Sequence, residues 1–152
     1  MGTNYETDVI VWAQEQVALL RSGKLTEIDI VHIAEEIADV GRAEQRELAN
    51  RMSILLAHLL KWKYQPDKRT NSWEITIRNQ RTSILKRLIK TPSLKPMLND
   101  PDWIEDVWAD AIQTASKETA IEVADFSLRC PWTMTDAITP DWMPDQRNEN
   151  TK

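Results

Sequence analysis

One hydrophobic stripe with helical spacing runs from Ile30 to Trp62 and constrains the fold more than any other feature of the sequence. Its members are three or four residues apart, which is the spacing of one face of an α-helix. They are Ile30, Ala34, Ile37, Gly41, Glu44, Leu48, Met52, Leu55, Leu59 and Trp62. We predict one long helix over about residues 29–64, which Pro66 ends because proline cannot continue the hydrogen-bond ladder.

Two features of the stripe indicate what surrounds this helix. In "ILLAHLL", residues 54–60, apolar side chains point in every direction, which is typical of a helix buried on all sides. Gly41 costs roughly 1 kcal/mol in a helix relative to Ala, and its place on the stripe indicates close approach of another backbone. We therefore expect the long helix to be the centre of a bundle.

Helical spacing and capping residues predict three further main helices and a short C-terminal turn. The helices cover about Thr7–Arg21, about Trp73–Lys90 and Pro101 to about Ala120, and Thr133 caps the turn. In the first helix, the hydrophobic stripe consists of Ile10, Ala13, Val17 and Leu20. Sustained apolar alternation and hairpin signals are absent from the sequence. The predicted fold is all-α, a compact helical bundle of four main helices plus the short turn.

The length of 152 residues, with 41% apolar and 28% charged, is usual for one domain. We predict a single helical domain over residues 1–144 and a disordered tail over residues 145–152. The lone cysteine, Cys130, fits a reducing cytosol. Neither a signal-peptide pattern nor a membrane-spanning apolar run is present, so we expect a cytoplasmic protein.

The net charge of −5 is distributed unevenly along the chain. Residues 1–50 carry four basic and ten acidic side chains, residues 51–98 carry eleven and two, and residues 99–152 carry four and twelve. One interpretation is that the basic middle packs among acidic ends. The other is that the basic middle binds an anionic partner.

Three polar residues interrupt the long stripe at seven-residue spacing, namely Glu44, Arg51 and His58. Each step is about 10.5 Å along the helix axis, so each residue needs a partner on another helix or water. Structural ion pairs with a neutral core histidine are one interpretation. The other is a polar-aromatic pocket lined by Glu36, Glu44, Arg51, His58, Trp62, Trp73, Arg78 and Arg81.

Metal and nucleic-acid binding have weaker support. His32 precedes Glu35 and Glu36, the reverse of the Glu-x-x-His order of di-iron bundles, and no second such motif exists, so we predict no metal and no cofactor. Basic residues interleaved with aromatics suggest contacts to phosphates and bases as an alternative. The candidates for that role are Arg69, Arg78, Arg81, Lys86 and Arg87.

Four quoted stretches give the chain a family resemblance. They are "YETDVIVWAQEQVALLRSGKLTEID", "HIAEEIADVGRAEQRELANR", "LLAHLLKWKYQP" with "SWEITIRNQRTSI", and "CPWTMTDAI" with "DWMP". The chain resembles an uncharacterised bacterial all-α family catalogued as domain of unknown function number twenty-nine. The resemblance implies a compact helical bundle and no established activity. The family's motif positions carried over here are Glu35, Glu36, Gly41, His58, Leu59, Leu60, Lys61, Trp62, Gln65, Pro66, Ser72, Trp73, Arg78 and Arg81.

The leading functional hypothesis is a non-enzymatic protein-interaction module that binds an unknown protein partner or itself as a homodimer. A long helix with polar interruptions, seven tryptophans and no nucleophile, phosphate-loop or dinucleotide pattern support this hypothesis. The alternatives are a nucleic-acid-associated regulator and a ligand- or metal-binding helical enzyme around Glu36, Glu44 and His58.

Overall fold

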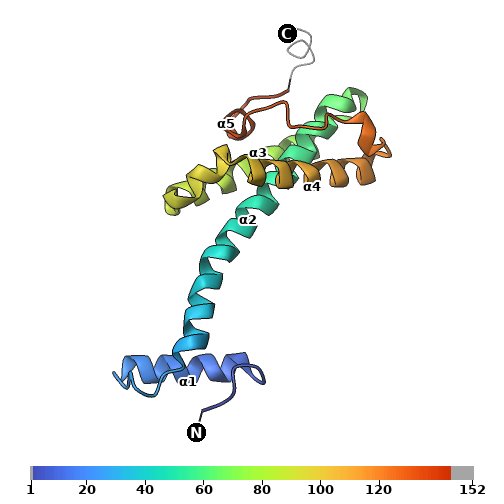
Figure 1. The fold of residues 1–152 in the computed structure, drawn as a ribbon. Coiled ribbons are helices and arrows are strands. Elements are labelled where there is room, and N and C mark those ends of the chain that lie inside the picture. The colour runs from blue at the N-terminus through green and yellow to red at the C-terminus, as the bar shows by residue number, and fades with distance from the viewer. Residues whose placement is uncertain (1, 145–152) are drawn as a thin grey trace. The chain divides into compact units, whose positions relative to one another are not determined.

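The computed structural model describes residues 2–144, which contain α-helices and short 3-10 helices but no strand. The α-helices are α1 (Val9–Arg21), α2 (Ile30–Tyr64), α3 (Asn71–Lys90), α4 (Pro101–Thr119) and α5 (Met134–Ile138) (Figure 1). The 3-10 helices are η1 (Pro66–Lys68), η2 (Pro92–Asn99) and η3 (Val123–Asp125). The predictions of an all-α fold, a long helix and four main helices with a short fifth are confirmed. The predicted tail over residues 145–152 lies outside the described residues.

Side-chain caps start the helices where the sequence indicates. The Asp8 carboxylate accepts a hydrogen bond from the Val11 N–H at 3.1 Å and so satisfies a donor that the first turn leaves unpaired. The same arrangement starts α3, α4 and α5 at Thr70, Asp100 and Thr133. Gly23 has a φ of +77°, which favours glycine and ends the turn after α1.

Helix α2 runs through Gly41 without interruption. The backbone approach that we expected at Gly41 is not found among the described residues, because nothing lies within 4 Å of the place where a Cβ atom would stand. The α2 helix belongs to two compact units, which divide between Glu44 and Gln45. The single domain over residues 1–144 stays a prediction.

The second unit, from Gln45 onward, holds the hydrophobic core. The C-terminal half of α2 is buried in it, with Leu48, Leu55 and Leu59 fully inaccessible to solvent. Side chains of α3, α4, α5 and η2 complete this core. The expectation of a helix buried on all sides is therefore confirmed for residues 55–57, 59 and 60 of α2.

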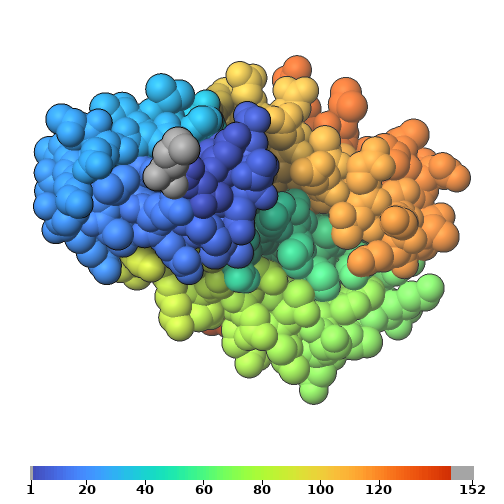
Figure 2. Space-filling model, turned by 90° about the horizontal axis from the view of Figure 1, so that it is seen from below, coloured from blue at the N-terminus to red at the C-terminus, as the bar shows by residue number. Residues whose placement is uncertain are grey.

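The first unit, up to Glu44, has a different interior. Among its described residues only Trp12 and Gln16 are buried. The segment before α1 folds back on that helix, since the Thr3 N–H donates to the Glu15 carboxylate at 2.6 Å. Figure 2 shows this segment, in the darkest blue, against the rest of the unit in lighter blue.

Candidate functional site

The first unit exposes an unusual number of large aliphatic side chains. The most exposed of them in α1 are Val9, Ile10, Val17 and Leu20, and the most exposed in α2 are Ile30, Val31, Ile37 and Val40. Their exposed fractions lie between 42% and 69%. We call these eight side chains the aliphatic surface. On α2, Ile30 and Ile37 share one face of the helix, and Val31 and Val40, nine residues apart, flank that face on opposite sides. It includes members of both predicted stripes, so the expectation that Ile10, Ile30 and Ile37 pack inside a bundle is wrong within this unit.

A polar and aromatic cluster occupies the place where α1 meets α2. The Tyr5 ring stacks on the His32 ring with centroids 4.2 Å apart, and the edge of Trp12 meets Tyr5 at 4.8 Å. The Trp12 Nε1–H donates to the Asp29 carboxylate at 3.0 Å, and the Tyr5 hydroxyl donates to Glu36. The aliphatic stripes therefore face outward, because polar and aromatic groups make the contact between the two helices.

Hydrogen bonds within this cluster shift the pKa values of its ionisable groups. His32 Nδ1 lies 2.7 Å from the Asp29 carboxylate, and this hydrogen bond raises the pKa of His32 and lowers that of Asp29. The hydrogen bond to Glu36 raises the pKa of the Tyr5 hydroxyl to about 12. The structure places His32 half-buried against Tyr5.

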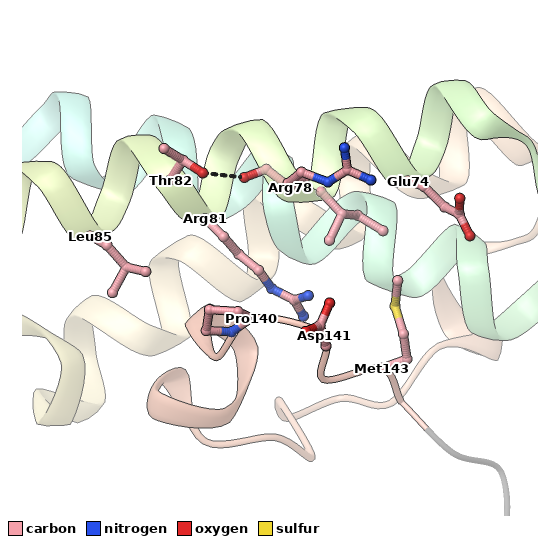
Figure 3. A pocket seen from close by; sticks show the side chains of 9 residues that line it. Glu74, Arg78, Arg81, Thr82, Leu85, Pro140, Asp141 and Met143 are labelled. Atoms are coloured by element: carbon pink, nitrogen blue, oxygen red, sulfur yellow. Dashed lines mark hydrogen bonds between the residues drawn. The ribbon is translucent and has the colours of Figure 1, made fainter.

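The second unit contains a pocket of about 300 Å³ between α3 and the segment after α5. Its lining residues are Glu74, Ile77, Arg78, Arg81, Thr82, Leu85, Pro140, Asp141 and Met143. Figure 3 shows the Arg81 side chain reaching from α3 toward Pro140 and Asp141. With two arginines and two carboxylates in its lining, the pocket has no dominant charge.

Arg81 of α3 binds the segment that contains Ala137 and Trp142. It is 4% exposed, its Nε–H donates to the Ala137 carbonyl at 2.8 Å, and its Nη2 donates to the Trp142 carbonyl. Desolvation lowers the pKa of Arg81, and the charge of Asp141 opposes that shift. The guanidinium thus acts first as a structural clamp.

The polar residues along the second half of α2 also have partners within the unit. Arg51 Nε lies 2.9 Å from Glu47, and Arg87 of α3 lies 3.4 Å from the same carboxylate. His58 Nδ1 donates to the Ile54 carbonyl at 2.9 Å, and burial lowers the pKa of His58. Arg51 and His58 thus have partners on α2 itself, whereas a partner on another helix or water was expected. Only Arg51 also contacts a neighbouring helix in these pairs, with its guanidinium 3.4 Å from Gln80 of α3.

The aromatic and basic residues at the end of α2 engage one another. The Arg69 guanidinium lies 4.7 Å from the centre of the Trp62 ring and donates to the Trp62 carbonyl at 2.8 Å. Lys61 Nζ lies 2.5 Å from Glu118 of α4 and 5.4 Å from the centre of the Trp73 ring. Residues 61–73 therefore fasten the end of α2 to its neighbours.

The structure separates the predicted pocket residues into several groups. Glu36 and Glu44 lie in the first unit, and the other six lie in the second, where only Arg78 and Arg81 line the same pocket. The residues that sequence reasoning missed are Tyr5 and Asp29 in the first unit and Glu74 and Asp141 in the pocket. Asp29 alone gave a signal, since it precedes a helix and can cap it.

The basic residues proposed for nucleic acid differ in exposure. Arg81 is buried, and Arg87 is half-buried with Glu47 as a partner. Arg78 and Lys86 are exposed, and so is Arg69, which stacks on Trp62. Lys61 pairs with Glu118 and Arg87 with Glu47, which agrees with a basic middle that packs among acidic neighbours. The hydrogen bonds of Arg81 go to backbone carbonyls instead.

Cys130 borders a second pocket, of about 550 Å³, beside α4. Its thiol donates to the Trp132 carbonyl at 3.3 Å, and burial raises the pKa of this thiol to about 11. A thiol with so high a pKa is a weak nucleophile at neutral pH. Among residues 2–144, no group of three His, Cys, Asp or Glu side chains is placed to hold a metal ion.

These features belong to an all-α protein whose second unit has a closed core and whose first unit does not. The chain belongs to the family described as Domain of unknown function DUF29, whose model matches residues 4–143. Neither the curated proteins nor the solved structures contain a significant match to the chain. In the part of the chain that the structure describes, no helix is both long and apolar enough to cross a membrane.

Proposed function

We propose that the chain is a protein-interaction module that binds its partner through the aliphatic surface of the first unit. The observation that carries this proposal is the exposure of Ile30 at 66% and Ile37 at 67% on a helix whose stripe is buried further along. Monomeric proteins expose single aliphatic residues often but seldom expose a large set on adjoining helices. Burying these side chains against a partner recovers the stabilisation that the isolated unit forgoes.

The proposed setting is the cytoplasm of a bacterial cell. The single cysteine is compatible with a reducing compartment, where disulfides are rare. The bacterial setting follows from the family resemblance alone.

Site-specific photocrosslinking tests this function in cells that express the chain. A photoreactive residue replaces Ile37 in one variant and Ile89 in a control, since Ile89 of α3 is also exposed, at 78%, but lies in the second unit. We expect a discrete product of higher mass from position 37 and none from position 89. Adding Ile30→Glu to the first variant should remove the product. Absence of any product at position 37, or equal products at both positions, would contradict the proposed function.

A further inference from the structure

We propose that the partner on the aliphatic surface is a second copy of this chain, so that two first units together enclose the hydrophobic core that neither has alone. This inference rests on the proposed function and identifies its partner. In a twofold arrangement the same surface serves both copies, and α1 and the first half of α2 from each copy supply four helices around one core.

The first argument is the size of the unit. Forty-four residues are close to the lower limit at which a chain folds with its own core, and units of this size usually need a disulfide, a metal or oligomerisation. The sole cysteine, Cys130, lies in the other unit, so the first unit has no disulfide. In this unit only Trp12 and Gln16 of the described residues are buried. Oligomerisation is one source of a core that the chain itself can supply.

The second argument is the composition of the surface. Every exposed large hydrophobic side chain in the described part of the first unit is Val, Ile or Leu, while Tyr5 and Trp12 turn toward the contact between α1 and α2. Surfaces that bind other proteins transiently are enriched in aromatic residues, methionine and arginine. Permanent homodimer interfaces are more apolar and resemble a domain core cut in half. The aliphatic surface resembles a permanent homodimer interface.

The third argument is continuity with an existing core. Ile30, Ile37 and Gly41 continue the same helical stripe that Leu48 and Leu55 bury in the second unit. Open space surrounds the position of a Cβ atom at Gly41, so another helix can approach there closely. The second half of the stripe already packs against neighbouring helices. The first half has the same spacing of aliphatic residues and is suited to pack against a helix of a second copy.

The exposed area is also sufficient. A fully exposed aliphatic side chain presents on the order of 100 Å² of apolar area. The eight members, each 42–69% exposed, therefore leave roughly 500 Å² bare on each copy. Standard interfaces bury about 800 Å² per partner, of which somewhat more than half is apolar. One flat contact cannot cover Val31 and Val40 together, so the aliphatic surface supplies most of the apolar part of an interface of that size.

The charge of the first unit predicts how self-association depends on salt concentration. Residues 1–44 hold nine acidic and three basic side chains, a net charge of −6, so two first units repel each other electrostatically. Salt screens this repulsion, so self-association through the aliphatic surface should strengthen as salt rises. A contact between the acidic first unit and the basic residues 51–98, whose net charge is +9, would weaken instead.

The test is the molar mass of the full chain by sedimentation velocity and light scattering over a range of concentrations. We expect a species of twice the 17.6 kDa chain mass. Ile37→Glu should weaken the association at least about 100-fold, because it buries an unpaired carboxylate, whereas Ile89→Glu should leave the association unchanged. Raising NaCl from about 0.05 M to about 0.5 M should tighten it. Ile37 is 67% exposed in the single chain, so Ile37→Glu should fold, which circular dichroism verifies.

Cysteine crosslinking supplies an independent readout in a Cys130→Ser background. Single cysteines replace Ile30, Ala34, Ile37 or Gly41 along the stripe, and Ile89 serves as the control position. We expect a disulfide-linked dimer from at least one stripe position under mild oxidation and none from position 89. A residue close to a twofold axis meets its own copy, which is why one position can crosslink alone.

The outcomes separate the two proposals. A monomer at about 100 μM at every salt concentration overturns the second-copy inference, as does a dimer that Ile37→Glu leaves intact. If a monomer still yields a photocrosslink to a different protein from position 37, the proposed function stands and its partner is another chain. If position 37 crosslinks to nothing, both proposals fail.

Discussion

The two halves of α2 carry one helical stripe, and they differ in what covers its aliphatic members. Leu48, Leu55 and Leu59 are fully buried, whereas Ile30 and Ile37 are about two-thirds exposed. The same spacing of aliphatic residues thus produces a core in one unit and a bare surface in the other. The difference teaches that periodicity defines a face able to pack, while the neighbouring elements decide whether it does.

The largest expected effect is a difference in stability between matched truncations in the two halves. Leu55→Ala should lower the free energy of unfolding by about 3 kcal/mol, since it leaves a cavity in a closed core. Ile37→Ala should change it by less than about 0.5 kcal/mol in dilute protein, because its side chain is already in water. Urea unfolding followed by tryptophan fluorescence measures both. Equal losses would remove the contrast between the halves.

A second prediction concerns the polar groups that the second unit buries. Arg81→Met should lower the free energy of unfolding by about 2 kcal/mol, because the carbonyls of Ala137 and Trp142 lose a charged donor. Arg78→Met is the matched control, since Arg78 lines the same pocket but is exposed, and it should cost less than about 0.5 kcal/mol. Urea unfolding measures the change in the free energy of unfolding. The rate of limited proteolysis in the segment that follows Ile138 measures how firmly that segment is held. An Arg81 variant as stable as its control would contradict the clamp.

The smallest expected effect is the separation of two histidine titrations, one in each unit. The carboxylate of Asp29 raises the pKa of His32 above 6.5, and burial lowers the pKa of His58 below 6.5. Because the pKa of His32 is raised on folding, protonated His32 stabilises the folded unit below pH 6.5. This contribution is lost as the pH rises through the pKa of His32 in the folded protein. The pKa of Asp29 is lowered on folding, so the ionised carboxylate stabilises the folded unit. That contribution is lost as the pH falls through the pKa of Asp29 in the folded protein.

Proton NMR of the two imidazole rings measures this order directly, because the chain contains only two histidines. His32→Gln identifies the signals. We expect His32 to titrate at higher pH than His58, and Asp29→Asn should lower the pKa of His32. The reverse order would contradict the hydrogen bond between His32 and Asp29.

Much of the fold could be predicted from the sequence because its signals are local. Asp100 before Pro101, and Thr133 as the cap of the last short helix, specify helix starts within a few residues. The end of α2 follows from Pro66, whose ring excludes a continuing hydrogen bond. Such signals act within one turn of the chain and require no knowledge of tertiary neighbours.

The candidate site could be predicted only in part, because its features depend on tertiary contacts. The stripe identified Ile30 and Ile37 as a packing face, but no local signal states which part of a stripe lacks a neighbour. Arg81 was assigned to a pocket, yet its burial depends on the Ala137 and Trp142 carbonyls, more than fifty residues away. The cluster around Tyr5 and His32 joins residues whose spacing in the sequence suggests no contact.

Hydrogen exchange along α2 tests the central claim most directly, because it compares both halves of one helix in the same sample. We expect the amides of residues 30–44 to exchange much faster than those of residues 48–60 in dilute protein, and to become protected as the protein concentration rises. The amides of residues 48–60 should stay protected at every concentration. Equal and concentration-independent protection of the two halves would show that the first half needs no second protein surface, which would contradict the account.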